Sequence, residues 1–363
     1  MPQVTEARIR EIVGAIDDPH SGATLAEGNA VRAVGVDGAR VSVDIQLGYP
    51  AAGWHGVLAD IARQRIEAEA GVESASVSAG SRIRSHKVQG KLSPLSGVKN
   101  IIAVASGKGG VGKSTVAVNL ALALKAEGAS VGIMDADIYG PSQMRMLGVE
   151  GKPDSPDGRK IVPKQAHGLQ MMSIGLLVEE DTAMIWRGPM VTQALMQLLG
   201  ETQWQDLDYL IVDLPPGTGD IHLTLCQRVP VSGAVIVTTP QDIALLDARK
   251  ALKMFGKVEV PVLGIVENMA TYVCSECGHE EHIFGAGGGA RMAGQYHVPL
   301  LGSLPLDGRI REQTDTGKPS VVAMPDSDIA ARYRDIARRA SGLLSTRARN
   351  KNLNFPEIVV QNT

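Results

Sequence analysis

The sequence predicts an α/β domain with a mostly parallel sheet covered by helices on both faces, preceded by a small α+β domain. Short apolar runs recur between helical segments at residues 101–105, 131–134, 209–212, 234–238 and 262–266. Runs that are apolar on both faces are typical of parallel strands buried between helices. A Gly-rich loop leads from the first run into a long helix, predicted at 114–127. The chain has 363 residues, which fit two domains better than one.

The N-terminal residues 1–82 carry a separate pattern. Ile9, Ile12 and Ile16 recur at helical spacing, and the turn Asp37–Gly38 joins two segments of strand character. We expect, in order, a helix at 5–16, strands at 30–36 and 40–47, a helix at 56–70 and a strand at 72–77. This arrangement predicts a small α+β domain.

Residues 83–98 are basic and contain Ser, Gly and Pro without an apolar pattern. They are predicted to be a linker that buries nothing. The second domain is then expected over 99–346. Residues 347–363 are mostly polar and predict a loose tail.

Composition excludes several classes of partner. Lys plus Arg 36 against Asp plus Glu 39 gives a net charge of -3, which argues against a nucleic-acid coat or a polybasic membrane anchor. Aromatic residues are only 3%, too few for base-stacking platforms. No apolar run nears the roughly 20 residues needed to cross a bilayer, and the N-terminus lacks a signal-peptide core. We expect a cytoplasmic protein with no membrane partner and no stable nucleic-acid partner.

The strongest motif, G-x-x-x-x-G-K-[ST], lies between a predicted strand and a predicted helix, the context that confirms it. It consists of Gly107, Lys108, Gly109, Gly110, Val111, Gly112, Lys113 and Ser114, with Thr115 next in the helix. Backbone N–H groups of such a loop face the phosphates, and the helix N-terminus adds partial positive charge. Lys113 would reach the β- and γ-phosphates, and Ser114 would ligate Mg²⁺. The motif predicts a P-loop NTPase domain that binds ATP and Mg²⁺.

Acidic residues end two of the apolar strands. Asp213 follows the apolar run 209–212, which is the position of a Walker B acid. It is predicted to be a second group on the Mg²⁺ side of the nucleotide site. Asp135 and Asp137 end another strand. Either could orient or deprotonate the attacking water, or hold a metal-bound water. The alternative is that a strand-end acid merely caps the following helix.

Lys108 is a lysine that an ordinary P-loop does not need. Its position resembles the deviant Walker A class, which includes MinD, ParA and the nitrogenase iron protein. In that class the first lysine reaches across a nucleotide-sandwich dimer to the partner's phosphates. The resemblance implies a homodimer, and the alternative is a solvent-exposed loop lysine.

The chain has three cysteines, and two of them, Cys274 and Cys277, form a C-x-x-C pair. Two thiolates complete neither a tetrahedral zinc site nor a four-iron cluster. His279 and His282 could complete a zinc site, or the pair could be a redox dithiol. A two-fold dimer could instead present four thiolates to one shared cluster, or the cysteines could simply pack. Cys226 lies at helical spacing among apolar residues and is predicted to be a core thiol.

Several motifs together resemble the Mrp/ApbC family of iron-sulfur cluster carrier ATPases over residues 99–345. They are residues 108–115, 134–142, 185–190, 213–220, 267–269 and the C-x-x-C followed by 283–285. The first domain resembles the MIP18-like module that often precedes these ATPases. Many such modules carry a cysteine near the start of their second helix, but 49–55 has none. Thiol chemistry in this domain is therefore not expected.

The resemblance implies an ATP-hydrolysing carrier that binds a labile 4Fe-4S cluster at a homodimer interface and transfers it to apo-proteins. Cys274 and Cys277 would bridge the cluster between protomers. The residues implied in hydrolysis are Lys108, Lys113 and Asp137, and those implied at the base are Asn268, Pro305 and Asp307. Arg187 matches the family motif without a role that can be derived. The glycines at 285–289 could form a flexible loop that lets the cluster site open.

Two other functions remain open at this point. One is a MinD/ParA-type nucleotide switch for spatial organisation on a membrane or DNA. The other is an electron-transferring reductase like the nitrogenase iron protein. The cluster cysteines of that protein are two separated single residues per chain, so the adjacent pair argues against it.

Overall fold

The computed structural model describes residues 4–90, 92–177, 188–274 and 276–348. The N-terminal domain is built from α1 (Glu6–Gly14), β1 (Asp17–Asp18), β2 (Ala23–Thr24), β3 (Val31–Asp37), β4 (Arg40–Leu47), α2 (Ala52–Glu67) and β5 (Ser74–Ser81). β3 pairs with β4 antiparallel and β4 with β5 parallel. Ile9, Ile45 and Leu58 belong to a core of this domain alone. The predicted α+β character is confirmed, although α2 begins earlier and β5 lies later than expected.

The second domain is built on a sheet of eight strands within the described residues, in the order β15-β12-β11-β6-β10-β7-β9-β8. The strands are β6 (Val98–Ser106), β7 (Val131–Asp135), β8 (Lys164–Ala166), β9 (Leu169–Ser173), β10 (Leu207–Asp213), β11 (Gly233–Thr238), β12 (Val262–Glu267) and β15 (Leu300–Ser303). Only β8 pairs antiparallel, which confirms the predicted mostly parallel sheet. The sequence missed β8, β9 and β15, which lie toward the sheet edges.

The helices of this domain are α3 (Lys113–Ala126), α4 (Gln143–Met146), α5 (Gly188–Glu201), α6 (Asp220–Arg228), α7 (Asp242–Lys257), α8 (Gly288–Tyr296), α9 (Gly308–Asp315), α10 (Ser320–Ala323) and α11 (Asp328–Ser345), with a 3₁₀ turn at Ile174–Leu176. The crossovers β6–α3–β7 and β11–α7–β12 run in opposite directions along the sheet. Because such crossovers are right-handed, α3 and α7 cover opposite faces. No helix of the described chain is both long and apolar enough to cross a membrane.

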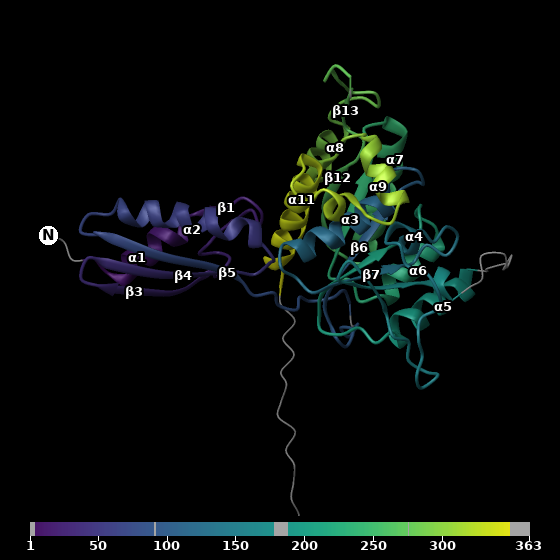
Figure 1. The fold of residues 1–363 in the computed structure, drawn as a ribbon, viewed down its shortest axis with the longest axis horizontal. Coiled ribbons are helices and arrows are strands. Elements are labelled where there is room, and N and C mark those ends of the chain that lie inside the picture. The colour runs from purple at the N-terminus through teal and green to yellow at the C-terminus, as the bar shows by residue number, and fades with distance from the viewer. Residues whose placement is uncertain (1–3, 91, 178–187, 275, 349–363) are drawn as a thin grey trace, which may run out of the picture.

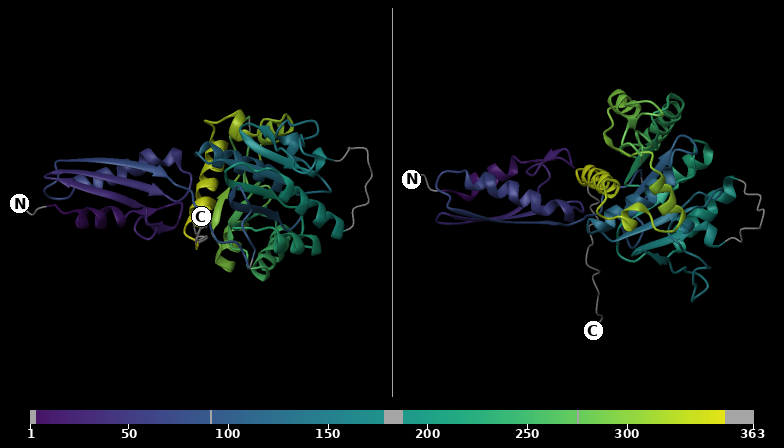
Figure 2. Two further views of the ribbon diagram at one scale, coloured as in Figure 1. Left: turned by 90° about the horizontal axis from the view of Figure 1, so that it is seen from below. Right: turned by 45° about the horizontal axis from the view of Figure 1, so that its top comes forward.

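The N-terminal domain lies beside α11 (Figures 1 and 2). The backbone N–H of Gly53 donates to Oε2 of Glu127 over 2.9 Å, and Nε2 of His20 lies 3.4 Å from Oδ1 of Asp335. Gly342 of α11 lies directly against His20, because a Cβ there would come within 2.7 Å of the His20 carbonyl oxygen. The two domains therefore share a close, partly polar contact.

The connection between the domains packs against the second domain. His86 donates its backbone N–H to Oδ1 of Asn100 over 3.0 Å. The Gln89 amide donates to the carbonyls of Cys226 and Val229 over 2.7 and 2.6 Å, at the end of α6. The expectation that 83–98 buries nothing is wrong, because polar side chains without an apolar pattern can still satisfy buried carbonyls. Arg187 and the predicted tail beyond 348 lie outside the described residues.

We predict that Gly342→Ala loosens the contact between the domains. The added Cβ would collide with backbone at His20, so the free energy of unfolding should fall by about 1–3 kcal/mol in urea denaturation. Gly256→Ala is the matched control, because Gly256 is also helical and a Cβ there meets nothing within 4 Å. Equal stability of the two variants would contradict the close contact.

Candidate nucleotide site and cysteine hairpin

The P-loop joins β6 to α3 in a conformation that needs glycine at two positions. Gly112 has a φ of 80°, and a Cβ there would lie 2.2 Å from Nδ2 of Asn268. A Cβ at Gly107 would lie 2.1 Å from backbone of Asp247 in α7. The loop is therefore held tightly between β12 and α7. α3 begins at Lys113, so the unpaired N–H groups of its first turn lie at the end of the loop.

Lys113, Ser114 and Asp213 meet at the carboxyl end of the sheet. The Lys113 ammonium pairs with Oδ1 of Asp213 and donates to Oγ of Ser114 over 3.2 Å. Lys113 is 6% exposed and Asp213 is 0% exposed. The structure thus brings together the predicted phosphate lysine, the predicted Mg²⁺ hydroxyl and the predicted Walker B acid.

Asp135, which ends β7, and Asp137, which follows the strand, have different surroundings. Asp135 accepts hydrogen bonds from the backbone N–H groups of Ser142 and Gln143 over 2.8 and 3.0 Å, so it caps α4 as the alternative reading proposed. Burial, together with the charge of Asp213, raises the pKa of Asp135 to about 7. Asp137 is buried, and its Oδ1 has no hydrogen-bond partner among the described residues. Burial raises the pKa of Asp137 above its ordinary value.

The donor atoms at this site fit Mg²⁺. Mg²⁺ takes oxygen ligands and keeps several of its waters. Ser114 and Asp213 offer a hydroxyl and a carboxylate. Among the described residues, Oδ1 of Asp137 and Oε1 of Gln143 are buried acceptors without partners, and waters on the ion could donate to both.

Lys108 lies in the loop with its side chain half-exposed. Its carbonyl accepts a hydrogen bond from Oγ of Ser106 over 2.9 Å, while its ammonium makes no ion pair with residues that the structure describes. The helix α7, which touches Gly107, exposes Ile243 and Leu246 in its first turns. The loop that carries Lys108 therefore packs against a helix that exposes two large apolar side chains.

The residues expected at the base come from two neighbouring loops. Ala270 donates its N–H to the Leu304 carbonyl over 2.9 Å, which places Pro305 beside the Asn268 loop. The Asn268 amide donates to the Val111 carbonyl over 2.9 Å, so its observed contact is with the P-loop. Asp307 caps α9 and pairs with Arg309 over 2.6 Å, and this hydrogen bond lowers the pKa of Asp307. Recognition of adenine by these residues stays a prediction.

Cys274 and Cys277 lie in a small hairpin between β13 (Tyr272–Val273) and β14 (Glu280–Glu281), at one end of the domain (Figure 1). Cys277 is exposed and Cys274 half-exposed. Backbone N–H groups of Cys277 and Glu276 donate to the Cys274 sulfur and lower the pKa of its thiol. Cys226 differs, because burial raises its pKa to about 12 and confirms the predicted core thiol.

The hairpin does not assemble a complete metal site. Nδ1 of His282 lies 2.9 Å from the Ala270 carbonyl, and His279 is exposed. In the part of the chain that the structure describes, no three His, Cys, Asp or Glu side chains are grouped to hold a metal ion. The zinc site completed by His279 and His282 is therefore not formed. The cysteine pair thus offers two thiols without a third grouped ligand among the described residues.

The glycines after the cysteines pack closely instead of forming only a flexible loop. The Gly289 N–H donates to Oε1 of Glu267 over 2.6 Å. A Cβ at Gly288 would come within 2.6 Å of the Pro240 carbonyl oxygen. The expectation of flexibility is wrong for these two residues, because they let α8 begin directly against β12 and α7.

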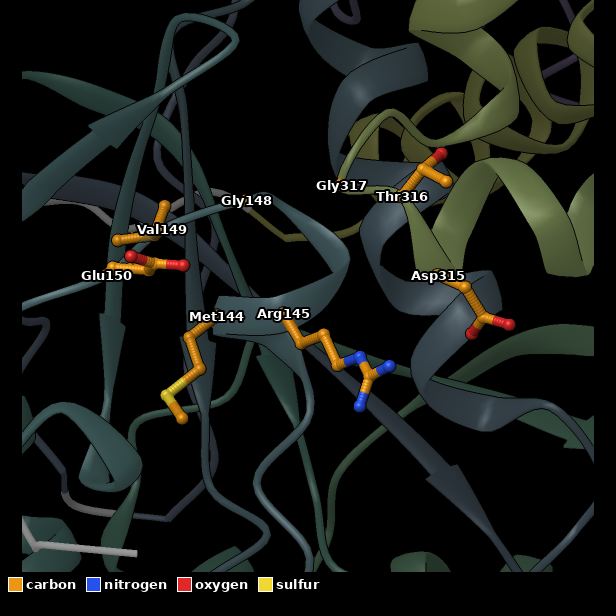
Figure 3. A pocket seen from close by; sticks show the side chains of 8 residues that line it. All are labelled: Met144, Arg145, Gly148, Val149, Glu150, Asp315, Thr316 and Gly317. Carbon is orange, nitrogen blue, oxygen red and sulfur yellow. The ribbon is translucent and has the colours of Figure 1, made fainter.

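Gln143 is a site residue that the sequence did not reveal. Its amide donates to Oδ2 of Asp213 over 2.8 Å and to the Ser114 carbonyl over 3.0 Å. The only available signal was its place just after 134–142 in the family motif. Met144 and Arg145, which follow Gln143 in α4, border a pocket of about 410 Å³ (Figure 3). Asp315 also lines this pocket, and none of the predicted site residues does.

Comparison with known families agrees with this geometry. Residues 97–341 match the family described as NUBPL iron-transfer P-loop NTPase. The chain belongs to this family. Residues 6–79 match a second family, described as iron-sulfur cluster assembly protein, which covers the N-terminal domain. The resemblance inferred from the motifs is thereby confirmed.

Relatives cover most of the chain. A Pseudomonas fragi protein named iron-sulfur cluster carrier protein is 60% identical over 269 residues, 74% of this chain and 94% of that protein. One of the same name from Synechocystis is 43% identical over 350 residues, 95% of this chain and 99% of that protein. An Archaeoglobus fulgidus nucleotide-binding protein, solved in complex with ADP, superposes with a TM-score of 0.56 at 38% identity, covering 64% of this chain and 91% of that one.

We predict that Cys274 is alkylated as a low-pKa thiol. In a Cys277→Ala variant, which keeps both backbone donors, the iodoacetamide rate at Cys274 should rise with pH to a midpoint below about 8.5, the ordinary thiol value. Peptide mass spectrometry measures the rate. Cys226 is the internal control and should stay unmodified in the folded protein. A midpoint at or above the ordinary value would show that the N–H groups do not stabilise the thiolate.

Proposed function

We propose that this protein is an ATP-binding and ATP-hydrolysing carrier that holds a labile 4Fe-4S cluster at a homodimer interface and transfers it to apo-proteins. The observation that carries the proposal is the cysteine half-site, which offers two accessible thiols on a domain that also has a P-loop. Two such hairpins related by a two-fold axis supply four thiolates, the usual ligand set of such a cluster. The carrier names of the relatives support the same cargo.

The nucleotide part of the function rests on the group around Lys113. On binding ATP, Lys113 exchanges its contact with Asp213 for the phosphates, and Ser114 and Asp213 hold Mg²⁺. Mg²⁺ held by these residues would supply positive charge against the phosphates. Asp137, whose buried Oδ1 has no partner among the described residues, orients the attacking water.

Dimerisation is supported by the surface near both sites. Lys108 has no ion-pair partner among the described residues and is free to reach the phosphates of a second chain. Ile243 is 69% exposed on α7, and Val273 and Ile283 are 51% and 49% exposed on either side of the cysteines. Exposed apolar side chains gathered near a site mark a protein contact. A second copy of this chain would cover them.

The end of β12 connects the nucleotide loop to the cysteine segment. Asn268 holds the Val111 carbonyl of the P-loop, while the preceding Glu267 holds Gly289 after the hairpin. A shift of the P-loop on ATP binding or hydrolysis would move the support of the cysteines as well. Nucleotide state thereby alters the grip on the cluster.

We predict that the two P-loop lysines separate binding from hydrolysis. Lys113→Ala should lose measurable ATP binding, because Lys113 is the buried cation at the end of the loop. Lys108→Ala should bind ATP but hydrolyse it about 10³-fold more slowly, as expected for a charge supplied from the partner chain. Equilibrium binding and phosphate release measure the two effects. Hydrolysis by Lys108→Ala at the wild-type rate would contradict a role for Lys108 across the dimer.

We predict that anaerobic reconstitution loads about four iron and four sulfide per two chains, measured by metal analysis and absorbance. Cys274→Ser and Cys277→Ser should each lose most of this uptake, whereas Cys226→Ala should keep it because Cys226 is buried in the core. Equal uptake by Cys274→Ser would sink the carrier proposal. Absence of cluster together with ATP-dependent sedimentation on liposomes or a shift of duplex DNA would favour the MinD/ParA-type switch.

A further inference from the structure

Gln143 is held rigidly inside the nucleotide site. Its side chain is 0% exposed, and its backbone N–H donates to Oδ2 of Asp135 over 3.0 Å. Its amide nitrogen donates to Oδ2 of Asp213 and to the Ser114 carbonyl, over 2.8 and 3.0 Å. Both partners are acceptors, so the amide orientation is determined: the nitrogen faces them and the oxygen cannot.

Oε1 of Gln143 is therefore a buried acceptor with no partner among the described residues. Buried carbonyl oxygens are rarely left without a donor in native proteins. The Lys113 ammonium already contacts Asp213 and Ser114. Phosphate oxygens of a bound nucleotide are acceptors as well and cannot satisfy an amide oxygen. A water molecule on a metal ion is a donor, and Mg²⁺ keeps several waters when proteins bind it.

We infer that Gln143 is a positioning residue of the metal site: its nitrogen orients Asp213 beside Ser114, and its Oε1 accepts a hydrogen bond from a water on the Mg²⁺ ion. This rests on the nucleotide part of the proposed function. Two buried acceptors, Oε1 of Gln143 and Oδ1 of Asp137, then have donors once the metal is bound. Gln143 acts on the ion through Asp213 and through water. Its loss therefore weakens Mg²⁺ binding without removing a contact to the phosphates.

The test is a Mg²⁺ titration of the full chain with a fluorescent ADP analogue. Gln143→Met keeps the length of the side chain and removes both hydrogen-bonding groups. It should raise the Mg²⁺ concentration for half-maximal tightening of nucleotide binding by about 10- to 100-fold, the usual effect of losing a residue that orients metal ligands. Nucleotide affinity in EDTA should be unchanged.

Gln170→Met is the matched control and should titrate like wild type. Gln170 lies on β9, outside the site, and its amide donates to the Gln205 carbonyl over 2.8 Å. Circular dichroism checks that the Met variant folds. If it does not, Gln143→Asn replaces it, because asparagine keeps a polar amide and is one methylene shorter. Gln143→Asn should raise the Mg²⁺ requirement as well. An unchanged Mg²⁺ requirement in folded Gln143→Met would overturn the inference, as would an equal loss of affinity in EDTA. A wild-type protein that shows no Mg²⁺ response would instead overturn the nucleotide part of the proposed function.

Discussion

At the carboxyl end of the sheet, among the described residues, the buried ammonium of Lys113 faces three buried carboxylates. The parallel register of β7 and β10 places Asp135 directly opposite Asp213, and Asp137 follows in the next turn of chain. Among the described residues, Lys113 forms an ion pair with Asp213 and with no other acid, so negative charge is left in excess. A pKa of about 7 lets Asp135 carry a proton near neutrality, which relieves part of that excess. The rest is the charge that a divalent cation would neutralise, so the fold itself creates the demand for metal.

The same edge of the sheet connects elements that are far apart in sequence. β6 leads into the P-loop, β7 into α4, and β12 into the loop that carries Asn268 and then the cysteine hairpin. Asn268 and Glu267 contact the P-loop and Gly289 from consecutive positions. Because a strand end is rigid, a displacement on one side of β12 is felt on the other. The P-loop and the segment that follows the cysteine hairpin thus share one support, the end of β12.

The sequence predicted features whose chemistry is local. The P-loop, the strand-end acids and the cysteine pair are each a few consecutive residues, so their spacing alone identified them. Contacts over long separations were missed: Gln143 reaches Asp213 across 70 positions, and Gln89 reaches Cys226 across 137. The edge strands β8 and β15 span three and four residues, which is too short for the pattern of apolar residues to reveal a strand. Gly288 and Gly289 resemble a flexible loop until the backbone that touches them is known.

In the proposed carrier, the hairpin with Cys274 and Cys277 would bring only half of the cluster's ligand set on each chain. Cargo occupancy would then obey mass action: at low protein concentration, the concentration of loaded dimers rises with the square of the protein concentration, and the loaded fraction rises in proportion to it. Dilution alone would unload such a carrier, and a recipient offering thiolates of its own could replace one protomer at a time. Retention of the cargo would thus depend on protein abundance as well as on nucleotide.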